Sequence, residues 1–432
     1  ADDMDNDLQQ DPEGSGGIAS STSVYSGTID SPFLIGEVSL TIDQDGLLTE
    51  TLFDRVMIAY ETIESLLLDN YVVHLRARNG DIRISRLGQG CEWFYRELWE
   101  AFALKVQTVL HAKGAPLFET KGRYTFNDRQ GEALIRIFSD CIMILPPNKD
   151  GRRIPLVFIN GMKREGYALS IILTTGEHYM FSMLGLDLDP FEGKIYEVIK
   201  ALQGRNTNFI STLDSSLGLA SAMNAARQLP EGIAVRHKEL SKSFPSLGSL
   251  LEKKLHNSRI SDYYNLLKMI CDQDNLAIGI FALPEEEVER LKRELLETMA
   301  ESAGEGETVP ELTSEQEDAL RWALWVVILA KNGRKVIAEF AFPNEQTATY
   351  IFHMNTSFDQ LLAILNRGLE ATSMQREIIS LPADQLWNDS HANDRMALDR
   401  TQSVQVLRKL YAGRAIHRSP ESWKKSLVEL IG

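Results

Sequence analysis

Four basic residues near the start of the chain have types and spacings that suit the binding of an anionic group. They are His74, Arg76, Arg78 and Arg83, and alternation along two short strands would place them on one exposed face. Guanidinium groups bind carboxylates and phosphates through paired, charge-assisted hydrogen bonds. The pattern predicts a binding surface for an acidic peptide or a phosphate. The alternative is a solvated strand face whose charges discourage edge pairing.

A second basic group predicts a further cationic rim. Arg152, Arg153, Lys163 and Arg164 flank the strand candidate Ile154–Phe158. The same chemistry would apply to this rim. The alternative is ordinary charge on solvated loops.

Other residues that could do chemistry have no matching partners in the sequence. His178 and His353 have no second ligand at metal-binding spacing, and Asp187 and Asp189 precede Pro190 as helix-capping residues do. The sequence contains no GxxxxGK[ST], GxGxxG, HExxH, GxSxG or CxxC pattern. We therefore predict no catalytic residue, no metal ligand and no cofactor, and leave open an enzyme hidden in residues 260–432.

The first basic group needs a β-hairpin to position it. Tyr71–Arg78 and Asp81–Arg86 are strand candidates, and Asn79-Gly80 between them favours a tight turn with positive φ. A helix is predicted over residues 92–112. The alternation also predicts which side chains of the first strand face inward: Val73, Leu75 and Ala77.

The same order of elements returns after residue 117 and predicts a duplication. A tyrosine followed by a turn glycine, then Leu-Gly, then a phenylalanine that opens a helix, occurs twice with matching spacing. The first set is Tyr71, Gly80, Leu87-Gly88 and Phe94, and the second is Tyr167, Gly176, Leu184-Gly185 and Phe191.

By this pattern the two stretches resemble tandem pleckstrin-homology-like (PH-like) domains over residues 33–203. The first copy rests on Gly36–Ile42, Ile58–Tyr60 with Ile63, Tyr71–Arg86, Leu87-Gly88 and Phe94–Phe102, and the second on Gly122–Phe126, Tyr167–Leu184 and Phe191–Leu202. The resemblance implies a bent antiparallel barrel capped by a C-terminal helix, and it implies binding of phosphoinositides, peptides or proteins without catalysis. Lipid-binding members carry Lys and Arg in the first loop. Here Asp43–Gly46 is acidic and Asn127–Gln130 nearly neutral, so lipid binding is disfavoured.

Charge and cysteine content bound the partners and the compartment. The net charge of −16 opposes binding to nucleic acid and to anionic membranes. Three widely spaced cysteines do not predict a disulfide framework. No signal-peptide pattern opens the sequence, and the longest apolar run, Trp322–Ala330, is shorter than the roughly 20 residues that cross a bilayer. We expect a cytoplasmic protein.

The chain is predicted to be an α+β protein with five parts. They are a disordered acidic tail (1–30), PH-like domains at 31–113 and 114–204, a helical connector (205–272) and a C-terminal α+β domain (273–432), with a possible third, degenerate copy at 320–372. The expected function is non-catalytic scaffolding of a protein partner. The alternatives are peripheral binding to anionic lipid and a chaperone for a basic protein, with the acidic tail as the contact.

Overall fold

The computed structural model describes residues 23–302 and 311–432, in two compact units. The first unit ends at Phe102 and the second begins at Ala103. Residues 1–22, which belong to the predicted tail, and residues 303–310 lie outside the described residues. Within the described ranges, no helix combines the length and apolar character needed to cross a membrane.

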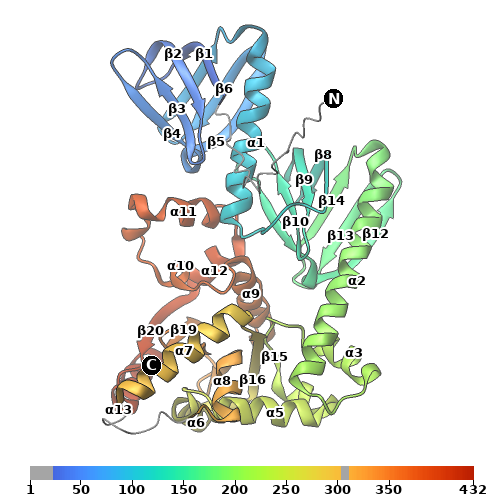
Figure 1. Cartoon of the computed structure of the whole chain (residues 1–432), viewed down its shortest axis with the longest axis vertical. Coiled ribbons are helices and arrows are strands. Elements are labelled where there is room, and N and C mark those ends of the chain that lie inside the picture. The colour runs from blue at the N-terminus through green and yellow to red at the C-terminus, as the bar shows by residue number, and fades with distance from the viewer. Residues whose placement is uncertain (1–22, 303–310) are drawn as a thin grey trace, which may run out of the picture. The chain divides into compact units, whose positions relative to one another are not determined.

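The first unit is a seven-stranded antiparallel sheet followed by a helix (Figure 1). The strand order is β4-β3-β2-β1-β7-β6-β5. Val73, Leu75 and Ala77 face the core as predicted, and the ring of Phe94 on the helix meets that of Tyr25 at 5.1 Å. The elements are β1 (Val24–Asp30), β2 (Ile35–Ile42), β3 (Gly46–Glu50), β4 (Arg55–Ala59), β5 (Ile63–Asp69), β6 (Val72–Ala77), β7 (Gly80–Ser85) and α1 (Cys91–Val109), which continues into the second unit.

Strand β1 corrects the predicted tail, which was expected to run to residue 30. Residues 14–30 are rich in Gly and Ser, which is typical of a linker, yet β1 at the end of this stretch pairs with β2 on one side and β7 on the other. These two neighbours satisfy its backbone groups, and Ile29 is fully buried. Because β1 is central, the sheet requires it.

The second unit opens with a sheet of the same topology, β11-β10-β9-β8-β14-β13-β12. Both sheets carry a bulge at the same place, between Ile63 and Ser65 in one and between Ile159 and Gly161 in the other. The end strands of each sheet do not pair with each other, so the predicted barrels are open sheets. The elements are β8 (Phe118–Phe126), β9 (Arg129–Ile137), β10 (Cys141–Leu145), β11 (Arg152–Pro155), β12 (Ile159–Glu165), β13 (Ala168–Leu173), β14 (His178–Ser182) and α2 (Leu188–Leu213).

Gly27 and Gly122 occupy equivalent positions in the two sheets. Each allows the segment that leads into the following helix to pack closely against its strand. A Cβ on Gly27 would lie 2.9 Å from the carbonyl oxygen of Ser85 and 3.1 Å from Leu87. A Cβ on Gly122 would lie 3.0 Å from the oxygen of Ser182 and 2.4 Å from Leu184. The repeat therefore extends to a packing detail that the sequence spacing did not reveal.

The rest of the second unit is a six-stranded antiparallel sheet between two layers of helices (Figure 1). Helices α3–α6 and α13 pack on one face, and α7, α9, α10 and α12 pack on the other. The strands, in spatial order, are β15 (Val235–Arg236), β16 (Cys271–Ala282), β17 (Trp322–Ala330), β18 (Lys335–Ala341), β19 (Ala348–His353) and β20 (Tyr411–Ile416). The helices are α3 (Leu219–Gln228), α4 (His237–Ser243), α5 (Pro245–His256), α6 (Ser261–Ile270), α7 (Glu285–Ser302), α8 (Ser314–Arg321), α9 (Phe358–Ala371), α10 (Glu377–Ser380), α11 (Ala392–Leu398), α12 (Gln402–Leu410) and α13 (Pro420–Ile431).

This arrangement corrects three further predictions. The segment 205–272 is not a separate connector, because its helices share one apolar core with the third sheet. Residues 320–372 form three neighbouring strands and a helix but not a seven-stranded sheet, because β16 and β20 flank those strands. The sequence of residues 393–412 also predicts a single helix, but the structure breaks it at Arg400 and continues into β20, where Gly413 admits the side chain of Leu430.

Candidate binding cavity

A cavity of about 690 Å³ lies within the second unit, between the second sheet and the helices of the third. One wall comes from the β8–β9 turn, the β13–β14 turn and Arg152 of β11. The other comes from α9 and the first turn of α12. Ligand pockets commonly have volumes of roughly 300–1,000 Å³ and often lie between domains, so the size and position of this cavity suit a binding site.

Local sequence signals fix these walls. Gly176 takes a positive φ of 87° in the tight β13–β14 turn, a conformation that favours glycine. Helix α9 begins with a capping box in which the Ser357 hydroxyl accepts from the Gln360 amide and the Gln360 side chain accepts from the Ser357 amide. The turn and the helix start are therefore set by their own residues.

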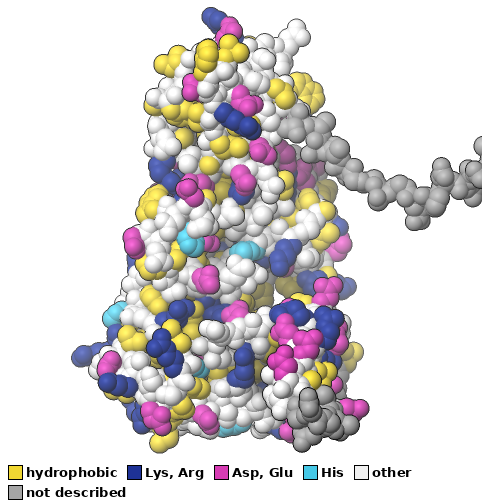
Figure 2. All heavy atoms as spheres, turned by 60° about the vertical axis from the view of Figure 1, so that its left-hand side comes forward, with side chains coloured by type: hydrophobic (Ala, Val, Ile, Leu, Met, Phe, Trp, Pro, Cys, Tyr) yellow, Lys and Arg dark blue, Asp and Glu magenta, His cyan; other side chains and the backbone are white. Residues whose placement is uncertain are grey.

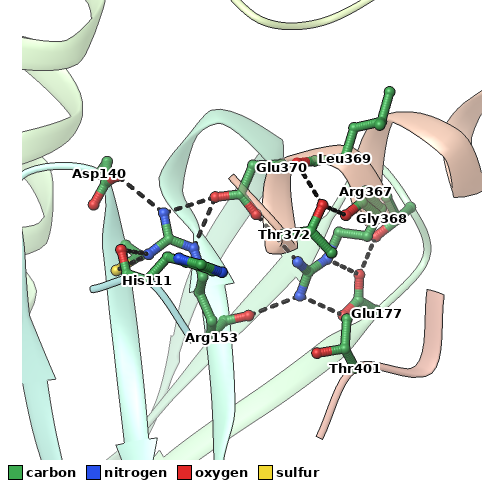
Figure 3. Close-up of polar contacts among 12 residues, drawn as sticks. His111, Asp140, Arg153, Glu177, Arg367, Gly368, Leu369, Glu370, Thr372 and Thr401 are labelled. Carbon is green, nitrogen blue, oxygen red and sulfur yellow. Dashed lines mark hydrogen bonds and ion pairs between the residues drawn. The ribbon is translucent and has the colours of Figure 1, made fainter. Parts of the chain in front are cut away.

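An arginine–carboxylate network joins the second sheet to α9 beside the cavity (Figure 3). Arg153 donates to Glu370 at 2.8 Å and to Asp140 at 2.9 Å. Arg367 donates to Glu177 at 3.1 Å and to the carbonyl oxygen of Arg153 at 2.7 Å. Glu370 also accepts from Arg367 at 3.3 Å, so one carboxylate serves both arginines.

The network keeps its members charged despite burial. Burial alone would lower the pKa of Arg367, but Glu177 and Glu370 raise it. Burial alone would raise the pKa of Glu177, but Arg367 and hydrogen bonds from Thr175 and Tyr179 lower it. These charges hold the wall together and are not available to a ligand.

Arg152 and Arg400 also line the cavity and have a different electrostatic setting. Burial lowers the pKa of Arg152 and lowers that of Arg400 to about 10. Both remain cationic at neutral pH. Arg152 donates to the carbonyl oxygen of Gly151 at 2.8 Å and lies over the ring of Phe126 at 4.9 Å.

The structure disperses the second predicted basic group. Arg153 is buried in the network, and Arg152 faces the cavity. Lys163 pairs with Glu165 at 2.9 Å, and Arg164 pairs with Asp189 and Glu192 on α2. These residues do not form one cationic rim, because carboxylates engage three of them.

The first predicted group stays together on the outer face of β6 and β7, but acidic residues accompany it. His74 and Arg83 are register partners, Arg76 lies 3.7 Å from Asp81, and Arg78 lies 3.2 Å from Glu61. On the face in Figure 2, Lys and Arg side chains are interspersed with Asp and Glu. The hairpin is therefore a face of mixed charge, and its role in binding stays a prediction.

Sequence reasoning missed Arg367, Glu370 and Arg400. Arg367 and Glu370 look like surface charges of a helix, and Arg400 fell inside a predicted helix. His178 bonds to Ser170 at 3.0 Å, and within residues 23–302 and 311–432 no cluster of His, Cys, Asp or Glu could hold a metal ion. Local patterns carry no signal for pairs that only the tertiary fold brings together.

Comparison with known proteins does not identify a family. No family model and no curated protein matches the sequence. Among the solved structures that match, one described as "Structure of the Spt16D Pob3N heterodimer" is similar over 36% of this chain and 85% of that chain, with 13% sequence identity and a TM-score of 0.16. Similarity at this score does not establish a shared fold.

Proposed function

We propose that this chain is a non-catalytic binding protein in which tandem PH-like domains act as a scaffold and the cavity receives part of the bound partner. The PH-like assignment is supported by two sheets of seven antiparallel strands in the same order, each followed by one long helix. A fold does not specify a ligand, so the function must be argued from the site.

The observation that carries the proposal is a cavity whose walls are held in place by a buried charge network. Arg153 and Arg367 bind Glu177 and Glu370 across the joint, which fixes the second sheet against α9. Because the walls are already fixed, binding costs less conformational entropy, which favours a higher affinity. The chaperone alternative depends on the acidic tail, most of which lies outside the described residues.

Filling the cavity tests the proposal. Ala363 is half-buried on α9 and lines the cavity, so Ala363→Trp should occupy it. Ala220→Trp, at an exposed position of α3, is the matched control. The wild-type chain and both variants would be used as baits in native lysate, and native mass spectrometry would weigh the intact complexes.

We expect a stoichiometric partner or ligand with the wild-type chain and the control, and its loss with Ala363→Trp. Thermal unfolding of each variant confirms that the chain is folded. Equal binding by all three chains would show that the cavity is not the binding site.

A further inference from the structure

We propose that the cavity binds a small phosphorylated ligand and that the Arg152 guanidinium contacts its phosphate. This rests on the proposed function, in which the cavity is a binding site. Three features of the cavity support this ligand: Arg152 keeps N–H donors for it, the nearby carboxylates are paired with other arginines, and a helix end lines the same space.

Arg152 has N–H donors that the described residues do not use. A guanidinium carries five N–H donors, and the hydrogen bond that Arg152 makes goes to the carbonyl oxygen of Gly151. Within the described parts of the chain, no carboxylate lies within 4.0 Å of Arg152. The Phe126 ring lies against the guanidinium and orients it. The remaining N–H groups suit a phosphate, which an arginine binds through two parallel hydrogen bonds.

The carboxylates around Arg152 are held by other arginines. Glu177 is bound by Arg367, and Asp359, the other acidic residue of the lining, is bound by Arg236 at 2.6 Å. Asp150, two residues from Arg152, is bound by Arg129 at 2.8 Å. A partly buried cation without a close counter-ion is unfavourable, and an anionic ligand would offset that.

The N-terminus of α12 adds positive potential in the same cavity. Thr401, Gln402 and Ser403 line it at the start of this nine-residue helix. No side chain caps the helix, because the Thr401 hydroxyl donates to the carbonyl oxygen of Ala397 instead. Free amides and the macrodipole at a helix start favour phosphate. Arg152 and this helix end therefore line the same cavity, where both can contact one ligand.

The shape of the site favours a free ligand over a membrane or a nucleic acid. Turns of the second sheet form one wall and α9 and α12 the other, so the cationic groups lie between two walls. The net charge of −16 opposes an extended polyanion such as nucleic acid. A compact phosphorylated molecule fits both the volume and the charge.

Calorimetric titration of the full chain with inorganic pyrophosphate tests the proposal. We expect saturable 1:1 binding that weakens with added salt, because screening reduces attraction between charges. Arg152→Gln should weaken affinity about 10- to 100-fold, the range for losing hydrogen bonds to a charged group. Arg152→Lys should bind at an intermediate level, because it keeps the charge without the planar fork. Lys163→Gln is the control: it removes the same charge from a solvated strand and should leave the affinity for pyrophosphate unchanged. Thermal unfolding shows whether each variant is folded.

The outcomes separate the ligand chemistry from the function of the cavity. If pyrophosphate does not bind, or binds Arg152→Gln as it binds the wild type, the phosphate inference is wrong, while loss of a partner with Ala363→Trp would still support the cavity. If pyrophosphate binds Ala363→Trp unchanged, the anion binds elsewhere and the inference also falls. Sedimentation with vesicles containing phosphoinositides distinguishes the source. If the chain binds the vesicles, and both Arg152→Gln and added pyrophosphate abolish that binding, the phosphate belongs to a lipid headgroup. If the chain does not bind the vesicles, the phosphate belongs to a free ligand.

Discussion

At the scale of single residues, the second unit depends on two buried arginines. Arg153 is 6% exposed and Arg367 is 8% exposed, and Glu370 accepts hydrogen bonds from both. A buried ion pair contributes little net stability over apolar side chains of the same volume, whereas removing one partner leaves an uncompensated charge. Glu370 is therefore the residue whose loss should be most damaging.

We predict that Glu370→Gln lowers the free energy of unfolding by about 3–5 kcal/mol, the range for breaking a buried ion pair. Urea-induced unfolding followed by tryptophan fluorescence measures this. Glu197→Gln on α2 is the control, because Glu197 pairs with Lys194 at an exposed site, where the effect should stay within about 1 kcal/mol. Equal, small effects in both variants would mean that the network adds no stability.

At the scale of elements, the first unit depends on a close approach between two strands. Gly46 of β3 pairs with Ala59 of β4. A Cβ on Gly46 would lie 2.3 Å from the carbonyl oxygen of Ile58 and 2.9 Å from the Cα of Ala59. Both atoms are backbone, so no rotamer change relieves the contact.

We predict that Gly46→Ala destabilises the first unit by about 1–3 kcal/mol, the range for overpacking. Gly161→Ala in β12 is the control, because a Cβ there meets no atom within 4 Å. Hydrogen exchange should show faster exchange across β3 and β4 in Gly46→Ala alone. Unchanged exchange there would show that the strands can separate without loss.

The sequence allowed the elements with strong local signals to be predicted, and not those defined by their partners. The hairpin at 71–86 follows from Asn79-Gly80 and strict alternation. The structure confirms the hairpin, but Gly80 pairs with Ala77, so the turn lies at Arg78-Asn79. Strand β1 ends a stretch rich in Gly and Ser and is held as a strand by pairing on both sides. Strand β20 directly follows the amphipathic helix α12. The sequence pattern therefore predicted a helix that runs past Leu410, where α12 ends.

The candidate site was harder to predict for a similar reason. Arg152 and Arg153 were identified as basic residues, but adjacent residues on a strand point to opposite sides. One faces the cavity, and the other binds Glu370, which lies 217 residues away in the sequence. A spacing rule cannot anticipate a pair at that separation.

At the scale of the whole molecule, each unit has a buried core of its own. Leu40, Val73 and Ile84 belong to the first unit, whereas Ile135, Ile171 and Phe181 lie under the second sheet. We predict two transitions in differential scanning calorimetry. Gly46→Ala should shift one and Glu370→Gln the other. A single transition that both substitutions shift equally would mean that the units unfold as one.

The third sheet delays the burial of the end of α2 while the chain is being synthesised. A growing chain that has reached Leu213 contains every strand of both seven-stranded sheets. The end of α2, however, carries Phe209, Ile210 and Leu213, which belong to one apolar core with Trp322 and Trp423. At roughly 5–20 residues per second, those apolar side chains wait on the order of tens of seconds for the rest of their core. During that interval both seven-stranded sheets can be complete while the apolar end of α2 is still exposed. Chaperones that recognise apolar segments would bind there.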